Sequence, residues 1–135
     1  MKDEYISAMY SVVKETSNDT GVDLPIDIEQ YIVALLASKL DKPYFIKSTF
    51  AESYLRIKNH RHAKDLADNC LFITGIFPSY GMNVRYYSDI GKTSYHIVSE
   101  STNNELFVTL GTHFDFVRSF LNSIKDKNSF RTNIL

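Results

Sequence analysis

Apolar residues recur along the first part of this chain with the three- and four-residue spacing of an amphipathic helix. In the segment DEYISAMYSVVKE, Tyr5, Met9 and Val12 fall on one side of such a helix, and Asp3 stands where an N-cap is expected. The next segment, TSNDTG at 16–21, consists of small polar residues and a glycine. Because such a cluster favours a loop, we expect the first helix to end where it begins.

A second helix is predicted between two prolines. In DLPIDIEQYIVALLASKLDKP, Pro25 suits the first helical turn and Pro43 follows the last turn. Asp27 and Glu29 lie near the positive end of the helix dipole, which favours acidic side chains. Apolar residues occupy nearly every side of this helix, so we expect it to be the buried central helix of a bundle.

The same periodicity predicts further helices in the rest of the chain. We expect them from near Ser48, from Ala63 to Phe77, from about Val84 to Ser99, and from Asn103 through the whole of NNELFVTLGTHFDFVRSFLNSI. The basic segment RIKNHRHAK at 56–64 is interpreted as a junction or an exposed helix start, and residues from about 126 to 135 are expected to be frayed.

The predicted fold is therefore an all-α, single-domain bundle of five or six helices that spans residues 1–135. The last helix is expected to carry one continuous apolar stripe, formed by Leu106, Leu110, Phe114, Val117 and Leu121. The expected core contains Ile32, Leu35, Leu36, Leu66, Cys70, Ile73 and Leu110.

Two glycines interrupt predicted helices and need an explanation. Gly75, in LFITGIFPS, costs about 1 kcal/mol relative to alanine, and Pro78 then ends the helix. We expect Gly75 to allow a close helix contact; the alternative is a backbone opened for a ligand. Gly91 lies four residues from both Tyr87 and Tyr95, so the predicted helix has a notch flanked by two rings.

Composition and charge exclude some classes of partner. A chain of 135 residues is expected to bury roughly two-thirds of the surface that its unfolded form exposes, so one core is feasible. The net charge of −1 does not favour binding to nucleic acid or to an anionic membrane surface. We expect no membrane span, because no segment has the ~20 apolar residues required. MKDEYISAMY does not resemble a signal peptide, so a cytoplasmic protein is expected, and the Lys-, Asn- and Ile-rich composition suits a bacterial one.

The sequence contains no recognisable catalytic or metal-binding motif. Cys70 is the single cysteine, and in ADNCLFI it is interpreted as a buried small hydrophobe. The histidines show no HExxH pattern, although a metal site assembled from separate helices, for example from His96, His113 and Glu52, stays open. No phosphate-binding glycine loop and no nucleophile elbow is present. We therefore predict no catalytic residue, metal or cofactor, and the interpretation leans away from an enzyme.

Three segments resemble a family of uncharacterised bacterial all-helical proteins. They are LPIDIEQYIVALLA, LADNCLFITGIFPS and VRYYSDIGKTSYHIVSE, within about residues 24–100. The family pattern has a Leu-Pro start, then Gly-Asp-X-X-Leu-Phe-X-X-Gly-X-Phe-Pro, then Tyr-Tyr-X-X-Gly-X-X-X-Tyr. Ala67 stands where the pattern has its first glycine, and three residues separate Tyr87 from Gly91 where the pattern has two. The resemblance implies a helical fold and brings no activity with it.

The unusual feature of the composition is its content of rings, nine tyrosines and nine phenylalanines. Tyrosine is common at protein interfaces, where it adds contact area at little entropic cost. The leading hypothesis is therefore a non-enzymatic protein that binds itself, as a homodimer, or another protein. The alternative is a module that binds a small apolar or aromatic ligand in a pocket between helices. The candidate site for either partner is Tyr80, Arg85, Tyr86, Tyr87, Gly91 and Tyr95.

Overall fold

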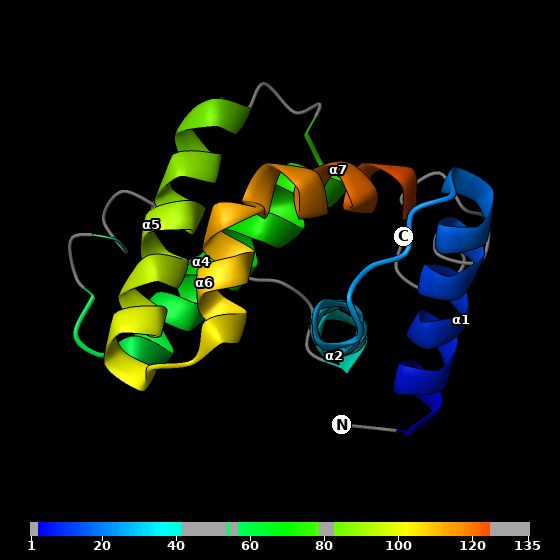
Figure 1. Ribbon diagram of the computed structural model, residues 1–135, viewed down its shortest axis with the longest axis horizontal. Helices are drawn as coiled ribbons and strands as arrows, with labels where there is room; N and C mark the ends of the chain where they lie inside the picture. Colours follow the sequence, from blue (N-terminus) through cyan, green and yellow to red (C-terminus); the bar gives the residue numbers. More distant parts are fainter. Residues whose placement is uncertain (1–2, 42–53, 55–56, 79–82, 125–135) are drawn as a thin grey trace. The chain divides into compact units, whose positions relative to one another are not determined.

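The computed structural model describes residues 3–41, 54, 57–78 and 83–124 of the chain (Figure 1). Within these residues every regular element is a helix, which confirms the predicted all-α class. The helices are α1 (Asp3–Thr20), α2 (Ile26–Asp41), α4 (His60–Ile76), α5 (Val84–Thr102), α6 (Glu105–Thr112) and α7 (Phe114–Ile124). The helix expected from near Ser48 and the frayed tail at 126–135 lie outside the described residues.

Contacts between residues divide the chain into two compact units. The first comprises Met1–Phe45 with Phe120–Leu135, and the second comprises Ile46–Ser119. α7 contributes its first residues to the second unit and its last residues to the first. The single-domain organisation over residues 1–135 stays a prediction.

In the first unit, α1 packs against α2. Buried apolar side chains recur along both helices at helical spacing: Met9, Val12 and Val13 on α1, and Ile28, Ile32, Leu35 and Leu36 on α2. The Lys14 ammonium lies 3.0 Å from a carboxylate oxygen of the largely buried Glu29, and so adds an ion pair between the two helices. α2 is apolar on nearly all sides, as the sequence indicates, but Ile26 and Ala34 are exposed.

In the second unit, α5 packs against both α4 and α6 (Figure 1). An asparagine precedes each of these three helices, and its side-chain oxygen accepts a hydrogen bond from a backbone N–H of the first turn. The donors are His62 for Asn59, Tyr86 for Asn83 and Leu106 for Asn104, over 2.9 to 3.0 Å. Asparagine is a favoured N-cap because its oxygen satisfies an otherwise unpaired amide.

The core residues expected from the sequence are all buried, which confirms that prediction; they are Ile32, Leu35, Leu36, Leu66, Cys70, Ile73 and Leu110. α4 begins at His60 with an exposed basic turn and ends at Ile76, two residues before Pro78. The predicted helix from Ala63 to Phe77 is therefore confirmed, although α4 starts three residues earlier and ends one residue earlier than predicted. Gly75 lies in the last turn of α4 and is buried.

The first helix is longer than predicted, because TSNDTG at 16–21 does not end it. Thr16 and Ser17 are buried within α1, and the Thr16 hydroxyl donates a hydrogen bond to the Val12 carbonyl oxygen over 2.9 Å. The Thr16 hydroxyl is thus satisfied inside the helix. α1 ends at Thr20, and Gly21 follows with φ +73°, a conformation that glycine adopts without steric cost.

The single helix expected from Asn103 is in fact two helices, α6 and α7, separated at His113. His113 has φ −105° and ψ 24°, outside the helical range. Gly111 and Thr112 are weak helix formers, which explains why the helix ends easily at this point. Of the expected stripe, Leu110, Phe114, Val117 and Leu121 are buried and Leu106 is partly exposed.

Gly91 lies at a close contact between elements, as the sequence analysis predicts. A Cβ atom placed on Gly91 would lie only 2.5 Å from the Phe114 ring and 3.1 Å from the Cβ of Cys70. Phe114 is fully buried, so moving its ring would displace other packed side chains. The expected notch is therefore already filled by a ring of the same unit, and it is not open to a ligand.

Replacing Gly91 with alanine is expected to destabilise the protein. The added methyl group overpacks the contact with Phe114, at an expected cost of about 1 to 3 kcal/mol in the free energy of unfolding. Urea denaturation followed by circular dichroism measures this change.

Gly111→Ala is the matched control, because a Cβ there would also lie within 3 Å of a ring, that of His96. His96 is exposed, so its imidazole can rotate away, and alanine gains helix propensity. We expect this variant to be at least as stable as the wild type. Equal effects of the two substitutions would contradict the packing explanation.

Candidate functional site

The predicted site residues at the start of α5 are accessible. Arg85 and Tyr86 are exposed, Tyr86 to 45%, and Tyr87 is partly buried. The Tyr86 and Tyr87 rings meet edge to face, with their centroids 5.3 Å apart. Successive helical residues point about 100° apart, which is why only one of the two rings is exposed. Tyr80 lies outside the described residues.

Tyr95 does not belong to the accessible surface at the start of α5. Its side chain is fully buried beside the rings of Phe107 and Phe114, with centroids 6.2 and 6.1 Å away. Its hydroxyl donates a hydrogen bond of 2.6 Å to Asp68, whose second carboxylate oxygen accepts one of 2.8 Å from the Lys64 ammonium. Tyr95 and Asp68 thus connect α5 to α4 inside the second unit.

Gly91 also lies outside the accessible surface at the start of α5. It is buried, with the Phe114 ring beside it. The sequence reveals that position 91 has no side chain. It does not reveal that the ring of Phe114, 23 positions later in the chain, fills the space. Among the described residues, the predicted site residues with accessible side chains are Arg85, Tyr86 and Tyr87.

A charged cleft of about 550 Å³ lies beside the start of α5, and the sequence analysis did not identify it. α5 contributes five of its lining residues and the first half of α7 contributes two. They are Val84, Arg85, Ser88, Asp89, Lys92, Asp115 and Arg118. All seven belong to the second unit.

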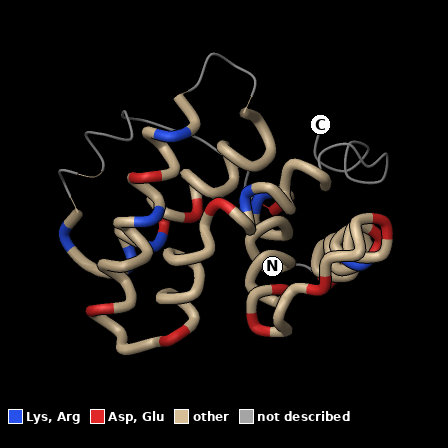
Figure 2. Tube along the Cα trace, turned by 45° about the horizontal axis from the view of Figure 1, so that its top comes forward, with Lys and Arg blue, Asp and Glu red and all other residues tan. Residues whose placement is uncertain are grey.

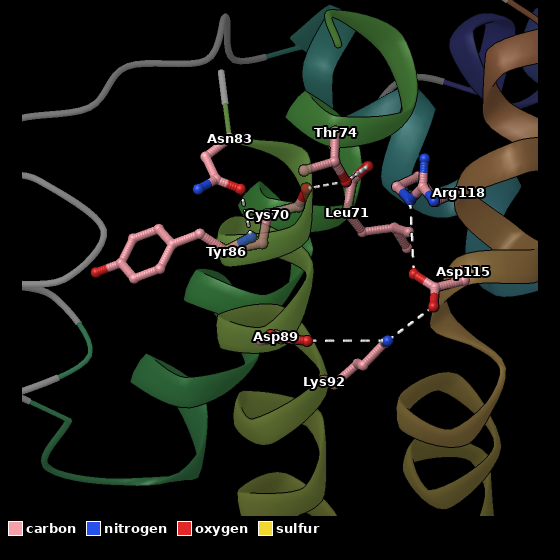
Figure 3. A network of polar contacts seen from close by, with 9 residues as sticks. All are labelled: Cys70, Leu71, Thr74, Asn83, Tyr86, Asp89, Lys92, Asp115 and Arg118. Carbon is pink, nitrogen blue, oxygen red and sulfur yellow. Dashed lines mark hydrogen bonds and ion pairs between the residues drawn. The ribbon is translucent and has the colours of Figure 1, made fainter.

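Asp115 connects the charged side chains of the cleft (Figure 3). One of its oxygens lies 2.7 Å from the Lys92 ammonium, and the other lies 3.7 Å from Nε of Arg118. Asp89 lies 4.0 Å from the same ammonium. The hydrogen bond from Lys92 lowers the pKa of the Asp115 carboxyl below its ordinary value, so this group is ionised at neutral pH.

Two polar groups of the cleft are buried and have no hydrogen-bond partner among the described residues. They are the Ser88 hydroxyl and Nε of Arg118. Ser88 is only 2% exposed, although it lines the cleft.

Spacing along one helix could have indicated the pairs Asp89–Lys92 and Asp115–Arg118, but no local sequence signal indicates that Lys92 pairs with Asp115.

The described residues contain no group of three His, Cys, Asp or Glu side chains that could hold a metal ion. His96 and His113 are both exposed, and Glu52 lies outside the described residues. In the part of the chain that the structure describes, no helix is both long enough and apolar enough to span a bilayer. Basic and acidic residues occur together on α1, α2, α4, α5 and α7 (Figure 2).

No family model, curated protein or solved structure matches this chain. The resemblance to a bacterial helical family therefore stays a prediction, and functional inference depends on the geometry described above.

Replacing Tyr95 with phenylalanine is expected to destabilise the second unit without changing its packing. The substitution removes the hydroxyl donor to Asp68 and leaves a buried carboxylate oxygen with one partner fewer. We expect a loss of about 1 to 3 kcal/mol in the free energy of unfolding, measured by urea denaturation. Tyr86→Phe is the matched control, since that ring is exposed, and should change the value by less than about 0.5 kcal/mol. Equal stability of both variants and the wild type would contradict a structural role for Tyr95.

The Cys70 thiol is expected to be unreactive in the folded protein. Burial raises its pKa to about 12, so almost none of it is thiolate at pH 8. Alkylation by iodoacetamide at pH 8, followed by mass spectrometry, should be at least about a hundredfold slower in the native protein than in urea. Rapid labelling of native protein would contradict the interpretation of Cys70 as a core residue.

Proposed function

We propose that this chain is a non-enzymatic protein-binding module that contacts a second copy of itself or another protein through the start of α5. The surface consists of Arg85, Tyr86 and Tyr87 and is called the Tyr86 surface below. The observation that supports the proposal is the exposed ring of Tyr86, which points away from the charged cleft in Figure 3. Exposed tyrosine and arginine are the residue types that contribute most to protein interfaces.

The Tyr86 ring is also held in place before any partner binds. It meets the Tyr87 ring edge to face, with the centroids 5.3 Å apart. A side chain that is already ordered loses little conformational entropy on binding, which favours affinity. The only cysteine is buried, which further supports a binding role over one in nucleophilic catalysis.

The alternative of a small apolar ligand receives less support. The cleft that the structure describes is lined mostly by charged side chains, and an apolar ligand would have to remove water from them without replacing their hydrogen bonds. The notch at Gly91, which suggested an apolar site, is filled by Phe114.

Light scattering over a concentration series tests the Tyr86 surface. We expect the average mass of the wild type to rise with concentration, and Tyr86→Ala to weaken self-association by about tenfold, as loss of an interface tyrosine does. Tyr10→Ala is the matched control, because Tyr10 on α1 is exposed to a similar extent, 48%. It should associate like the wild type.

A pull-down with the wild type, Tyr86→Ala and Tyr10→Ala tests whether the Tyr86 surface binds another protein. A partner that uses the Tyr86 surface is retained by the wild type and by Tyr10→Ala, and is lost with Tyr86→Ala. If the wild type is monomeric at every concentration and both variants retain the same proteins as the wild type, the proposed function is wrong.

A further inference from the structure

The charged cleft has one positive charge more than it has negative charges. Its lining includes three cationic side chains, those of Arg85, Lys92 and Arg118, and two carboxylates, those of Asp89 and Asp115. Lys92 and Arg118 both face Asp115. Arg85 forms no ion pair with any other described residue, so the excess charge belongs to an exposed guanidinium at the edge of the cleft.

The cleft also contains buried donors that form no hydrogen bond with another described residue. They are the Ser88 hydroxyl and Nε of Arg118, and Nε lies 3.7 Å from the Asp115 carboxylate, beyond ordinary hydrogen-bond distance. Removing such groups from water without a replacement partner costs free energy, so they are poised to donate to a ligand that enters. They lie on two different helices, α5 and α7, and both line the same cleft.

We propose that this cleft binds a small oxyanion, the phosphate or carboxylate group of a metabolite-sized molecule. The anion accepts hydrogen bonds from the Ser88 hydroxyl and from the guanidinium of Arg118, and Arg85 supplies the balancing charge. Hydrogen bonds from charged donors to oxyanions are stronger than those between neutral groups. A volume of about 550 Å³ lies in the usual range for small-molecule sites.

Asp115 acts as an internal competitor of the bound anion. Its carboxylate already accepts from the Lys92 ammonium at 2.7 Å and lies 3.7 Å from Arg118 (Figure 3). An anion that enters the cleft must share these two cations with Asp115, and it is repelled by the charge of Asp115. Removing that charge should therefore tighten the binding of an anion.

Titration of the full-length protein, followed by amide NMR spectra, tests the site. The probes are inorganic phosphate and acetate, each compared with sodium chloride at the same ionic strength. We expect saturable shifts of the amides of residues 84–92 and 115–118 with at least one of the two oxyanions. Tighter binding of phosphate assigns a phosphate ligand, and tighter binding of acetate assigns a carboxylate ligand. If neither binds more tightly than chloride, the proposal is wrong.

Ser94 provides a matched control for the role of Ser88. Both serines lie on α5, and both hydroxyls are buried without partners among the described residues, but only Ser88 lines the cleft. Ser88→Ala should weaken binding of the anion by about tenfold, the effect of losing one hydrogen bond to a charged group. Ser94→Ala should leave it unchanged. Equal affinities of these two variants would overturn the assignment of Ser88.

Variants of the charged residues separate specific binding from a general effect of charge. Arg118→Lys keeps the charge and removes Nε, and should weaken binding by about tenfold. Arg61→Gln removes a positive charge from the exposed start of α4, outside the cleft, and should bind as the wild type does. Asp115→Asn should bind more tightly than the wild type. Weaker binding by Arg61→Gln than by Arg118→Lys, or no gain in Asp115→Asn, would contradict the proposal.

The proposed oxyanion site and the proposed Tyr86 surface can be tested independently of each other. Tyr86 does not line the cleft, so Tyr86→Ala should retain the affinity of the wild type for the oxyanion. Urea denaturation of each variant verifies that a change in affinity does not reflect loss of the fold.

Discussion

The contact between the Phe114 ring and Gly91 is the constraint on which the second unit of this protein depends. The ring lies where a side chain on α5 would otherwise be, and Cys70 of α4 borders the same space. Residues from α4, α5 and α7 thus meet at one fully buried point. Because glycine leaves room there, a whole aromatic ring can enter the core, and its burial contributes on the order of 2 kcal/mol to stability.

Most of the helices could be predicted from the sequence, because their periodicity is a local property of the chain. Two helix ends were predicted at the wrong positions, and the two errors have different physical causes. At Thr16 the side-chain hydroxyl hydrogen-bonds to the preceding turn, and a segment whose composition predicts a loop continues the helix. At His113 the apolar spacing continues across the junction, although the backbone leaves the helical range. Spacing alone does not reveal either outcome.

The candidate site was less predictable than the fold. Exposure of one of the two neighbouring rings, Tyr86 and Tyr87, follows from the angle between successive helical residues, which the sequence determines locally. Burial of Tyr95 depends on Asp68, which lies 27 residues away on another helix. The charged cleft depends on Lys92 and Asp115, which are separated by 23 residues. Such pairs form only when the helices pack, so no motif in a single sequence marks them.

An asparagine caps the N-terminus of each of α4, α5 and α6, and its carboxamide does not titrate. A carboxamide keeps its acceptor oxygen at every pH, whereas an aspartate cap weakens on protonation. The ion pair between Lys92 and Asp115 behaves differently. Its carboxyl has a lowered pKa, so its contribution is present at neutral pH and is lost as the pH falls below the ordinary range of aspartate. Acid therefore releases the link between α5 and α7 while the first turns of the three capped helices keep their hydrogen bonds.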